Sequence, residues 1–210
     1  MTVVSGTVVP MATDPDTADL LAARRADPRY QRLMAVTRRA ARGGYDSVSM
    51  RDIAREAKLS MTTVYQFCGS KDHLIAEAHL EWMETFRDQM LRRRPRGRTA
   101  AARASTYIRQ ITDAWENQPV LTMTLQRAVY AIDPGSREVR AASGSAYKAI
   151  MNAALGDEDV PDRDAIVEIL GHVIDSVTFA WVCGSYDAAE GRRILERTVA
   201  TLLGPRGSGR

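Results

Sequence analysis

The amino-acid sequence predicts an all-α protein in two parts, a helix-turn-helix unit of three helices near the N-terminus and a larger helical body behind it. Apolar residues recur at the spacing of amphipathic helices through almost the whole chain. No segment alternates apolar and polar residues as a strand does, and no motif repeats at roughly 20–50 residues. Residues 49–74 have the caps and the turn of two short helices followed by a long one.

The first helix is predicted to follow an N-terminal tail, residues 1–26. Asp27 and Pro28 are the residue types of an N-cap and a first helical position, and two glycines at positions 43–44 end the apolar pattern. The start of the chain lacks the basic and strongly apolar regions of a signal peptide. The helix-turn-helix unit is therefore assigned to residues 27–72, and the tail before it is expected to be flexible.

The next two helices are predicted to be short and to be joined by a tight turn. Ser49 is a candidate N-cap for a helix that begins at Met50, and residues 58–60 form the turn. Ser60 can cap the second helix of the pair, residues 61–67. Apolar residues fall on the faces that the two helices turn toward each other: Ile53, Ala54, Ala57, Val64 and Phe67.

Polar side chains remain on the outer face of the second helix. A helix with such a face fits the major groove of DNA, where base edges present hydrogen-bond donors and acceptors. The expected base contacts are Thr62, Thr63, Gln66 and Arg51. The expected phosphate contacts are Ser49, Tyr65 and Lys71. The alternative is an ordinary pair of packed helices with a solvated face, because the same geometry also occurs without DNA.

The charge distribution agrees with a unit that faces phosphates. Residues 24–75 hold eleven Lys or Arg and five Asp or Glu, whereas the whole chain has a net charge of only +3. The rest of the chain is therefore net acidic, and basic charge is concentrated where DNA contact is expected. Three arginines at the start of this range are expected either to reach DNA as an arm or to stay solvated: Arg24, Arg25 and Arg29.

Residues 30–75 resemble the TetR family of transcriptional repressors. The resemblance is carried by TVYQFCGSK at residues 63–71 and by GGY at residues 43–45. It implies a DNA-binding helix-turn-helix domain. Three positions depart from the family pattern: Lys58 at a turn position usually held by Gly, Phe67 where a Tyr or His often contacts phosphate, and Cys68 in place of an aromatic residue. A left-handed backbone at the turn would cost roughly 1 kcal/mol in a residue other than glycine.

Behind this unit the pattern stays helical. A long helix begins near Lys71 and joins the two parts, and an Arg-rich segment at residues 91–98 is expected to be a solvated loop, with a second DNA-contacting patch as the alternative. Further helices are expected at residues 99–117, from Pro119 to a turn at 133–135, and at 136–155, 162–184 and 187–203. The body is assigned to residues 73–204, and residues 205–210 to a second tail.

Two functional surfaces are expected on this body, the first being a pocket for an apolar ligand. Methionine and aromatic side chains suit an irregular apolar cavity. The candidate lining residues are Trp115, Leu121, Met123, Leu125, Tyr130, Tyr147, Met151 and Phe179. The alternative is that these bulky residues are plain core.

The second expected surface is a dimer interface on the last two helices. These helices have more apolar residues than one neighbouring helix needs: Ile166, Ile169, Leu170, Val173, Ile174, Val177, Ala180, Trp181, Ile194, Leu195, Val199 and Leu202. Pairing with a second copy would bury this surface, and two copies of a helix-turn-helix protein read a palindrome. A homodimer through the last two helices is therefore expected.

Within the TetR family, the body resembles the KstR-type repressors of cholesterol and steroid catabolism. The similar segments are ENQPVLTMTLQRAVYAID, IVEILGHVIDSVTFAWV and RRILERTVATLLG. This resemblance implies a large apolar effector, which in that subgroup is a steroid-derived CoA thioester.

Composition and residue spacing set the remaining limits. Cys68 and Cys183 lie far apart in sequence, which suits a reducing cytoplasm, and they have no metal-ligand spacing with the histidines. There is no interpretable set of nucleophile and base and no phosphate-cradling loop, so neither catalysis nor a cofactor is expected. No apolar run is seen near the ~18 residues of a membrane span.

The sequence therefore predicts a cytoplasmic, dimeric, one-component transcriptional regulator. It is expected to be a repressor that binds a palindromic operator in duplex DNA and is released by a large apolar ligand. Two other classes stay open: a helical enzyme whose N-terminal motif is only structural, and an architectural DNA-binding protein that senses no ligand.

Overall fold

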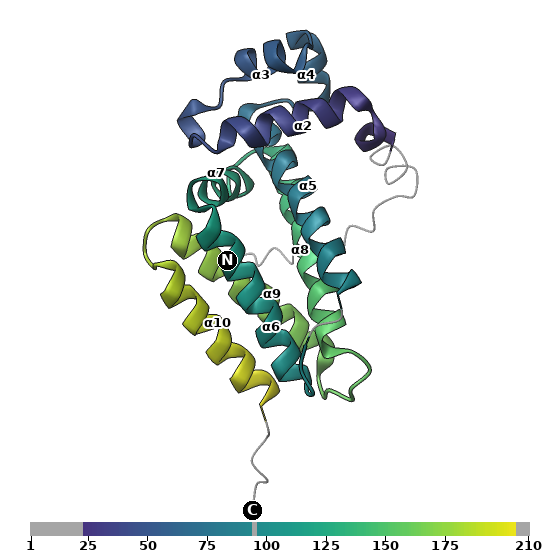
Figure 1. The fold of residues 1–210 in the computed structure, drawn as a ribbon, viewed down its shortest axis with the longest axis vertical. Coiled ribbons are helices and arrows are strands. Elements are labelled where there is room, and N and C mark those ends of the chain that lie inside the picture. The colour runs from purple at the N-terminus through teal and green to yellow at the C-terminus, as the bar shows by residue number, and fades with distance from the viewer. Residues whose placement is uncertain (1–22, 94–95, 205–210) are drawn as a thin grey trace, which may run out of the picture.

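The computed structural model describes residues 23–93 and 96–204, and among these residues the regular structure is helical, without strands. The helix-turn-helix unit lies at one end of an elongated molecule and the helical body at the other (Figure 1). The elements in chain order are α2 (Pro28–Ala41), the short 3₁₀ helix η1 (Tyr45–Ser47), α3 (Met50–Ala57), α4 (Met61–Phe67), α5 (Lys71–Arg92), α6 (Ala100–Asn117), α7 (Pro119–Val129), α8 (Pro134–Leu155), α9 (Arg163–Val182) and α10 (Ala188–Leu203). The all-α prediction is confirmed. Most of the two predicted tails lies outside the described residues.

Local capping explains where the helices of the N-terminal unit begin. The side chains of Ser49, Ser60 and Ser70 each accept a hydrogen bond from the backbone N–H three residues later, at the starts of α3, α4 and α5. Lys58 ends α3 in the left-handed region with a φ of 55°. The predicted caps at Ser49 and Ser60 are therefore confirmed, as is a left-handed turn residue at Lys58.

Residues 23–26 form a helical turn before α2 and contact α5. Arg24 donates to Glu77 Oε1 at 3.0 Å, and Arg25 donates to Glu84 Oε1 at 2.5 Å. Arg29 is paired with Asp27, the N-cap of α2. The three arginines that were considered for a DNA-contacting arm are therefore all held by carboxylates of the protein itself.

One hydrophobic core extends from the helix-turn-helix unit into the body. It contains Leu33 of α2, Ile53 of α3 and Val64 of α4, and it continues into Leu125 of α7 and Val139 of α8. A second core joins α6, α8, α9 and α10 at the far end of the body. Helix α5 packs against α2 on one side and against α7 and α8 on the other, so it links the two parts of the molecule (Figure 1).

Helix α8 begins two residues earlier than the sequence indicates. Pro134 occupies its first position and Asp133 is its N-cap, accepting a hydrogen bond from the backbone N–H of Ser136. Proline fits this position because the first N–H of a helix has no intrahelical acceptor. The segment that was predicted as a turn is thus the start of the helix.

Helix α9 is long and apolar enough, by length and composition, to cross a membrane. The expectation that no segment has this character is wrong, because the charged residues of this helix are few and spread out. Helix α9 packs against α7, α8 and α10 within the helical body. Within this chain 39% of the apolar window is buried, so α9 also keeps a face that its own chain does not cover.

Candidate nucleic-acid interface and ligand cavity

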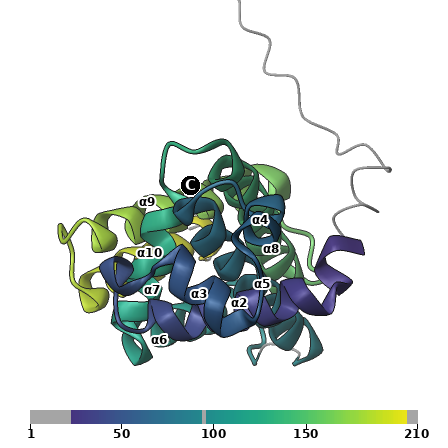
Figure 2. The same cartoon turned by 90° about the horizontal axis from the view of Figure 1, so that it is seen from above.

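The outer face of α4 is polar and exposed. Figure 2, seen from above, shows α2, α3 and α4 spread over this end of the molecule. Thr62 and Gln66 are exposed, and the Tyr65 side chain is 54% exposed, whereas Val64 faces the core. The hydroxyl groups of Thr63 and Ser60 lie 2.9 Å apart and share a hydrogen bond. The structure therefore brings the four predicted residues of α4 together on one short helix, with Thr63 partly engaged in its cap.

The predicted contacts outside α4 lie on the two neighbouring helices. Arg51 is exposed in the first turn of α3, and among the described residues no carboxylate is paired with it. Ser49 caps the same helix, so its hydroxyl is already an acceptor for the backbone. Lys71 starts α5, and its Nζ lies 4.1 Å from the centre of the Tyr45 ring. Arg127 of α7 lies over the same ring at 4.0 Å. Tyr45 therefore joins a predicted phosphate contact to the helical body.

A buried carboxylate holds the end of the recognition helix. Glu77 of α5 accepts hydrogen bonds from the Tyr30 hydroxyl at 2.7 Å and from Arg24 at 3.0 Å, and its Oε1 lies 3.4 Å from Nε2 of His73. Arg24 also donates to the backbone carbonyl of Phe67, the last residue of α4, at 2.5 Å. The carboxylate of Glu77 on α5 therefore holds the end of α4 through Arg24.

The charge state of Glu77 follows from these contacts. Burial acts to raise the pKa of this carboxyl group, but hydrogen bonds from His73 and Tyr30 and the charge of Arg24 outweigh it and leave the pKa below its ordinary value. Glu77 is therefore ionised at neutral pH, although its side chain is almost completely buried. Glu77 was not predictable from the sequence, because two of its three partners, Arg24 and Tyr30, lie 53 and 47 positions away in the chain.

The start of α8 touches the same corner between α4 and α5. The hydroxyl of Ser70 donates to Oδ2 of Asp133 at 3.0 Å, so the N-caps of α5 and α8 are bonded to each other. Gly135 packs so closely on the His73 ring that an added Cβ would lie 2.3 Å from it. The ring itself is held, because its Nδ1 accepts from the backbone N–H of Gly69 and its Nε2 faces Glu77. The start of α8 is therefore in direct contact with this corner.

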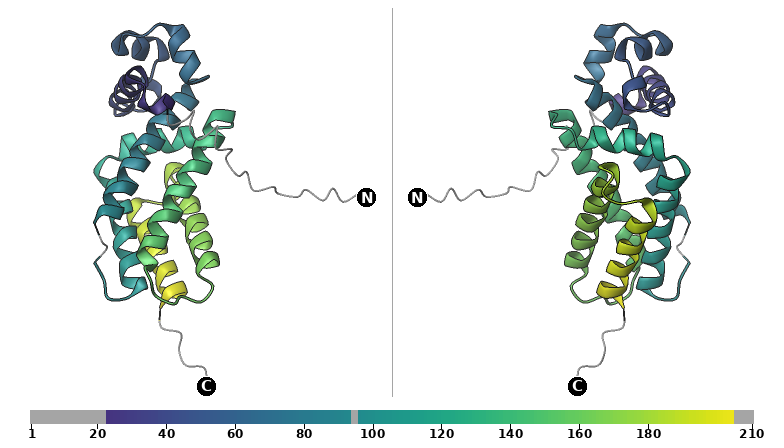
Figure 3. Two further views of the ribbon diagram at one scale, coloured as in Figure 1. Left: turned by 90° about the vertical axis from the view of Figure 1, so that its right-hand side faces the viewer. Right: turned by 90° about the vertical axis from the view of Figure 1, so that its left-hand side faces the viewer.

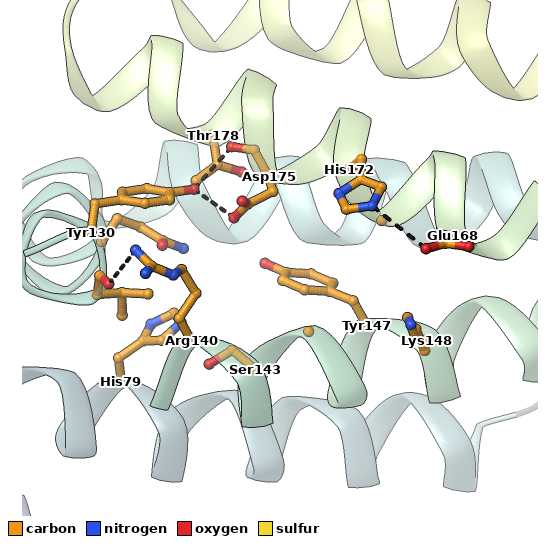
Figure 4. Close-up of a pocket in the computed structure, with 14 residues that line it drawn as sticks. His79, Tyr130, Arg140, Ser143, Tyr147, Lys148, Glu168, His172, Asp175 and Thr178 are labelled. Atoms are coloured by element: carbon orange, nitrogen blue, oxygen red, sulfur yellow. Dashed lines mark hydrogen bonds and ion pairs between the residues drawn. The ribbon is translucent and has the colours of Figure 1, made fainter. Parts of the chain in front are cut away.

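A cavity of about 210 Å³ lies between α5, α7, α8 and α9 (Figure 4). The lining residues include Tyr130 and Tyr147, two of the predicted ligand contacts. Tyr130 donates to the Asp175 carboxylate at 2.9 Å, and its ring meets Phe179 edge-on with the ring centres 5.0 Å apart. The rest of the lining is more polar than the sequence analysis expected: His79, Gln126, Val129, Arg140, Ser143, Gly144, Lys148, Glu168, Gly171, His172, Asp175 and Thr178.

The other predicted ligand contacts lie elsewhere. Trp115 and Met151 are in the second core, where Trp115 stacks on Trp181 with the ring centres 5.6 Å apart. Leu121 and Leu125 lie in the first core, beside a gap of only about 10 Å³. Met123 is on the outer surface of α7, and Phe179 is half exposed on α9. The structure thus gathers two of the predicted residues around one cavity and places the others outside its lining.

The polar lining residues were not predicted, because bulky apolar side chains were expected around an apolar ligand. One signal was present, since His79 lies four residues after Ile75 and four before Met83, on an apolar face of the long helix after Lys71. Burial lowers the pKa of His79 to about 4, so its ring is neutral at pH 7.

Helices α9 and α10 run side by side on one flank of the body (Figure 3, right). Most of the apolar residues predicted for a dimer interface face the core of the same chain, such as Ile174 and Leu195, which are fully buried. The exposed face of α9 follows a spacing of three and four residues along the helix: Ala165, Ile169, His172, Ser176 and Phe179. Ile169 is 44% and Phe179 is 49% exposed. An apolar face of this kind remains available for a second copy.

Comparisons with known proteins match both parts of the chain. Residues 33–78 match the family described as bacterial regulatory proteins, tetR family, and residues 97–202 match the family described as tetracyclin repressor-like, C-terminal domain. The chain is 29% identical over 187 residues to the HTH-type transcriptional repressor KstR of Rhodococcus jostii (strain RHA1), an alignment that covers 89% of this chain and 87% of that protein.

Two solved structures share the fold. A TetR transcriptional regulator from Rhodococcus sp. RHA1 aligns with a TM-score of 0.72 and 16% identity over 84% of this chain and 96% of that chain. The transcriptional regulator FadR from Bacillus subtilis in complex with stearoyl-CoA aligns with a TM-score of 0.57 and 16% identity over 84% of this chain and all of that chain, 100%. With both of its domains matched by sequence and by fold, the chain belongs to the TetR family of bacterial transcriptional regulators.

Proposed function

We propose that this protein is a dimeric one-component repressor that binds an inverted-repeat operator and leaves it when an apolar effector fills the cavity between α5, α7, α8 and α9. The observation that carries the proposal is the contact between the cavity-lining helix α8 and the corner that holds recognition helix α4. The similarity to a protein named as a transcriptional repressor, KstR, favours repression.

The DNA contacts follow from the exposed polar faces. Base edges are read by three exposed residues, Thr62, Gln66 and Arg51, and no carboxylate of the described residues is paired with this arginine. Phosphates are bound by Tyr65, in the second half of α4, and by Lys71, at the start of α5, and these contacts set the register of α4 in the groove. Ser49 and Thr63 contribute less, since their hydroxyl groups already serve the helix caps.

We predict that Gln66→Ala and Lys71→Ala weaken operator binding in different ways. Gln66→Ala should change the preference at one base position by roughly 1–3 kcal/mol, as expected for loss of a bidentate contact. Lys71→Ala should weaken binding to every duplex and lower the salt slope of log K by about 1, because one phosphate neutralisation is lost. Fluorescence anisotropy with operator and single-base variants at several salt concentrations separates the two effects. If both variants lose affinity evenly across all sequences, Gln66 does not read a base.

The dimer is proposed to form through the exposed face of α9 together with α10. Burying Ile169 and Phe179 against a second copy removes the two largest apolar groups of this face from water. Ser176, between these two residues on the exposed face, is small enough to let a second helix approach closely. In a two-fold symmetric dimer the two α4 helices are related by the symmetry axis, as are the half-sites of an inverted repeat.

Release by the effector is proposed to act through α8. This helix lines the cavity with Ser143 and Tyr147, and its start holds the α4–α5 corner through Asp133 and Gly135. An effector that binds only when α8 has moved would shift the population toward a state in which the corner, and with it α4, is displaced. The Tyr45 ring, between Lys71 and Arg127, gives α7 a second contact with the DNA-binding unit.

The size of the effector is limited by the cavity. Its volume of about 210 Å³ is below the roughly 300–1,000 Å³ of typical sites for drug-sized ligands. A steroid-derived CoA thioester, the effector implied by the KstR-type resemblance, would therefore require the helices to separate further. FadR from Bacillus subtilis, a fold neighbour, is in complex with stearoyl-CoA, so a long acyl compound is compatible with this arrangement of helices.

A further inference from the structure

The cavity has a polar inner end made of buried side chains. Ser143, Gln126 and His79 come from three different helices, and each is at most 5% exposed. The Oγ of Ser143 is buried and has no hydrogen-bond partner among the described residues. A buried hydroxyl group without a partner is costly, so it indicates an acceptor or donor that a ligand supplies.

Arg140 lies beside this end, on the same face of α8 as Ser143. Its guanidinium group makes one long hydrogen bond of 3.5 Å, to the backbone carbonyl of Val129, and it forms no ion pair with a carboxylate of the described residues. Asp175 lines the opposite wall, on α9, where its carboxylate accepts from Tyr130 instead (Figure 4). The α8 wall of the cavity therefore offers positive charge that the protein itself does not neutralise by a direct contact.

The opposite end of the cavity is open to solvent. This rim is formed by three exposed residues, Lys148, Glu168 and His172, and Nε2 of His172 lies 3.8 Å from Oε1 of Glu168. Tyr147 lies between the rim and the inner end (Figure 4), and Gly144 and Gly171 also line the cavity. A ligand that enters between α8 and α9 at this rim would pass the ring of Tyr147 before it reaches Arg140.

We propose that the effector is a small apolar acid whose carboxylate binds Arg140 and Ser143 at the inner end of the cavity. The fork of a guanidinium matches a carboxylate, and the hydroxyl of Ser143 and the amide of Gln126 add neutral donors. The negative charge of the ligand is balanced by one positive charge, because Arg140 is the cation of this end and His79 is neutral. The Asp175 carboxylate keeps the acid on the α8 side by repulsion.

This assignment rests on the proposed function, because it takes the cavity as the effector site, and it narrows the chemical class. A CoA thioester carries its phosphates far from its acyl group. Its acyl end would place no negative charge at Arg140. An acid and the CoA thioester with the same apolar group are therefore expected to differ in their affinity for the Arg140 end of the cavity. Direct binding measurements separate the two.

The test measures binding to the full-length protein without DNA. Octanoate is compared with octanol and octanoyl-CoA, and naphthylacetate with naphthylethanol, by isothermal titration calorimetry. Each acid should bind roughly ten- to a hundredfold more tightly than its alcohol, as expected for a charge-assisted hydrogen bond. Arg140→Gln should reduce this preference to about one, and Ser143→Ala should reduce it in part. Lys148→Gln, which removes a cation of the rim, is the matched control and should keep the preference.

Three results would overturn the assignment: no acid of the panel binds, acid and alcohol bind equally, or Arg140→Gln keeps the preference for the acid. Thermal unfolding of Arg140→Gln should stay close to wild type, because this arginine makes only one long hydrogen bond. If octanoyl-CoA binds and octanoate does not, the effector is a thioester and not an acid, and the proposed function as a repressor still stands. Failure of the protein to bind any selected operator would instead reject the proposed function, whatever the ligand panel shows.

Discussion

Glu77→Gln is expected to lower the free energy of unfolding by about 2–3 kcal/mol, because it removes the charge on which Arg24 and Tyr30 converge. The loss should be smaller than for a fully buried ion pair, since the Arg24 side chain is 25% exposed and keeps part of its hydration. Arg24 also holds the last carbonyl of α4, so operator affinity should fall together with stability. Urea denaturation and anisotropy with operator DNA measure the two effects.

The matched control is Glu56→Gln on α3. Glu56 forms an ion pair with Arg39 on the surface, and both side chains are more than half exposed. A surface pair of this kind contributes about 0–1 kcal/mol, so this variant should unfold nearly like the wild type. If the two variants have the same stability, the buried network under α4 does not hold the recognition helix.

The pH dependence of stability gives an independent check on Glu77. Its folded-state pKa lies below the ordinary value of 4.5, so its stabilising contribution is present above that pH. The contribution is lost as the pH falls from about 4.5 through the lower pKa of the folded state. Unfolding free energy measured from pH 6 to pH 3 should therefore fall less steeply for Glu77→Gln than for the wild type. Parallel curves would mean that Glu77 titrates alike in the folded and unfolded states.

Gly135→Ala is expected to destabilise the protein by about 2–3 kcal/mol through overpacking. Its new Cβ would lie 2.3–2.6 Å from atoms of the His73 ring. The ring cannot swing aside without losing its contacts to Gly69 and Glu77. The start of α8 should therefore move away from the α4–α5 corner, and operator affinity should fall as well.

Gly144→Ala on the same helix is the control for this change. An added Cβ at Gly144 meets no atom within 4 Å, so the variant should gain about 0.5–1 kcal/mol from its greater helix propensity. Thermal unfolding of the pair thus separates a steric effect at the corner from a general effect of glycine in α8. Equal shifts of the two midpoints in the same direction would show that the contact between Gly135 and His73 does not constrain α8.

The N-terminal unit was predictable because its determinants are local. Ser49 and Ser60 each accept a hydrogen bond from the backbone N–H three residues later, and the turn at Lys58 lies between the two helices that they cap. The order and the starts of these helices therefore depend on residues that are close together in the sequence. The role of Arg24 was not predictable, because its partner Glu77 is 53 positions away. A basic residue before a helix-turn-helix unit can equally contact DNA.

The cavity was harder to predict, because helix packing decides which side of each helix faces it. Trp115 and Met151 have the residue types of a ligand pocket, yet they fill the core at the far end of the body. Tyr130 follows the last residue of α7 and Tyr147 lies on α8, so they line one cavity only in the folded chain. Small and polar residues such as Ser143 and Gly144 define the cavity, and such residues stand out in a sequence only when their burial is known.

Two copies of this chain are expected to read an inverted repeat and to leave it when the cavity is filled. The most direct test selects bound sequences from random duplex DNA and footprints the purified protein on the selected operator, with its mass in the complex measured by sedimentation. The expected result is a dimer, or a multiple of it, that protects two inverted half-sites centred roughly 34–36 Å apart, or a small multiple of that distance. A monomer that protects a single unrepeated half-site, or a dimer that protects all sequences equally, would contradict the account.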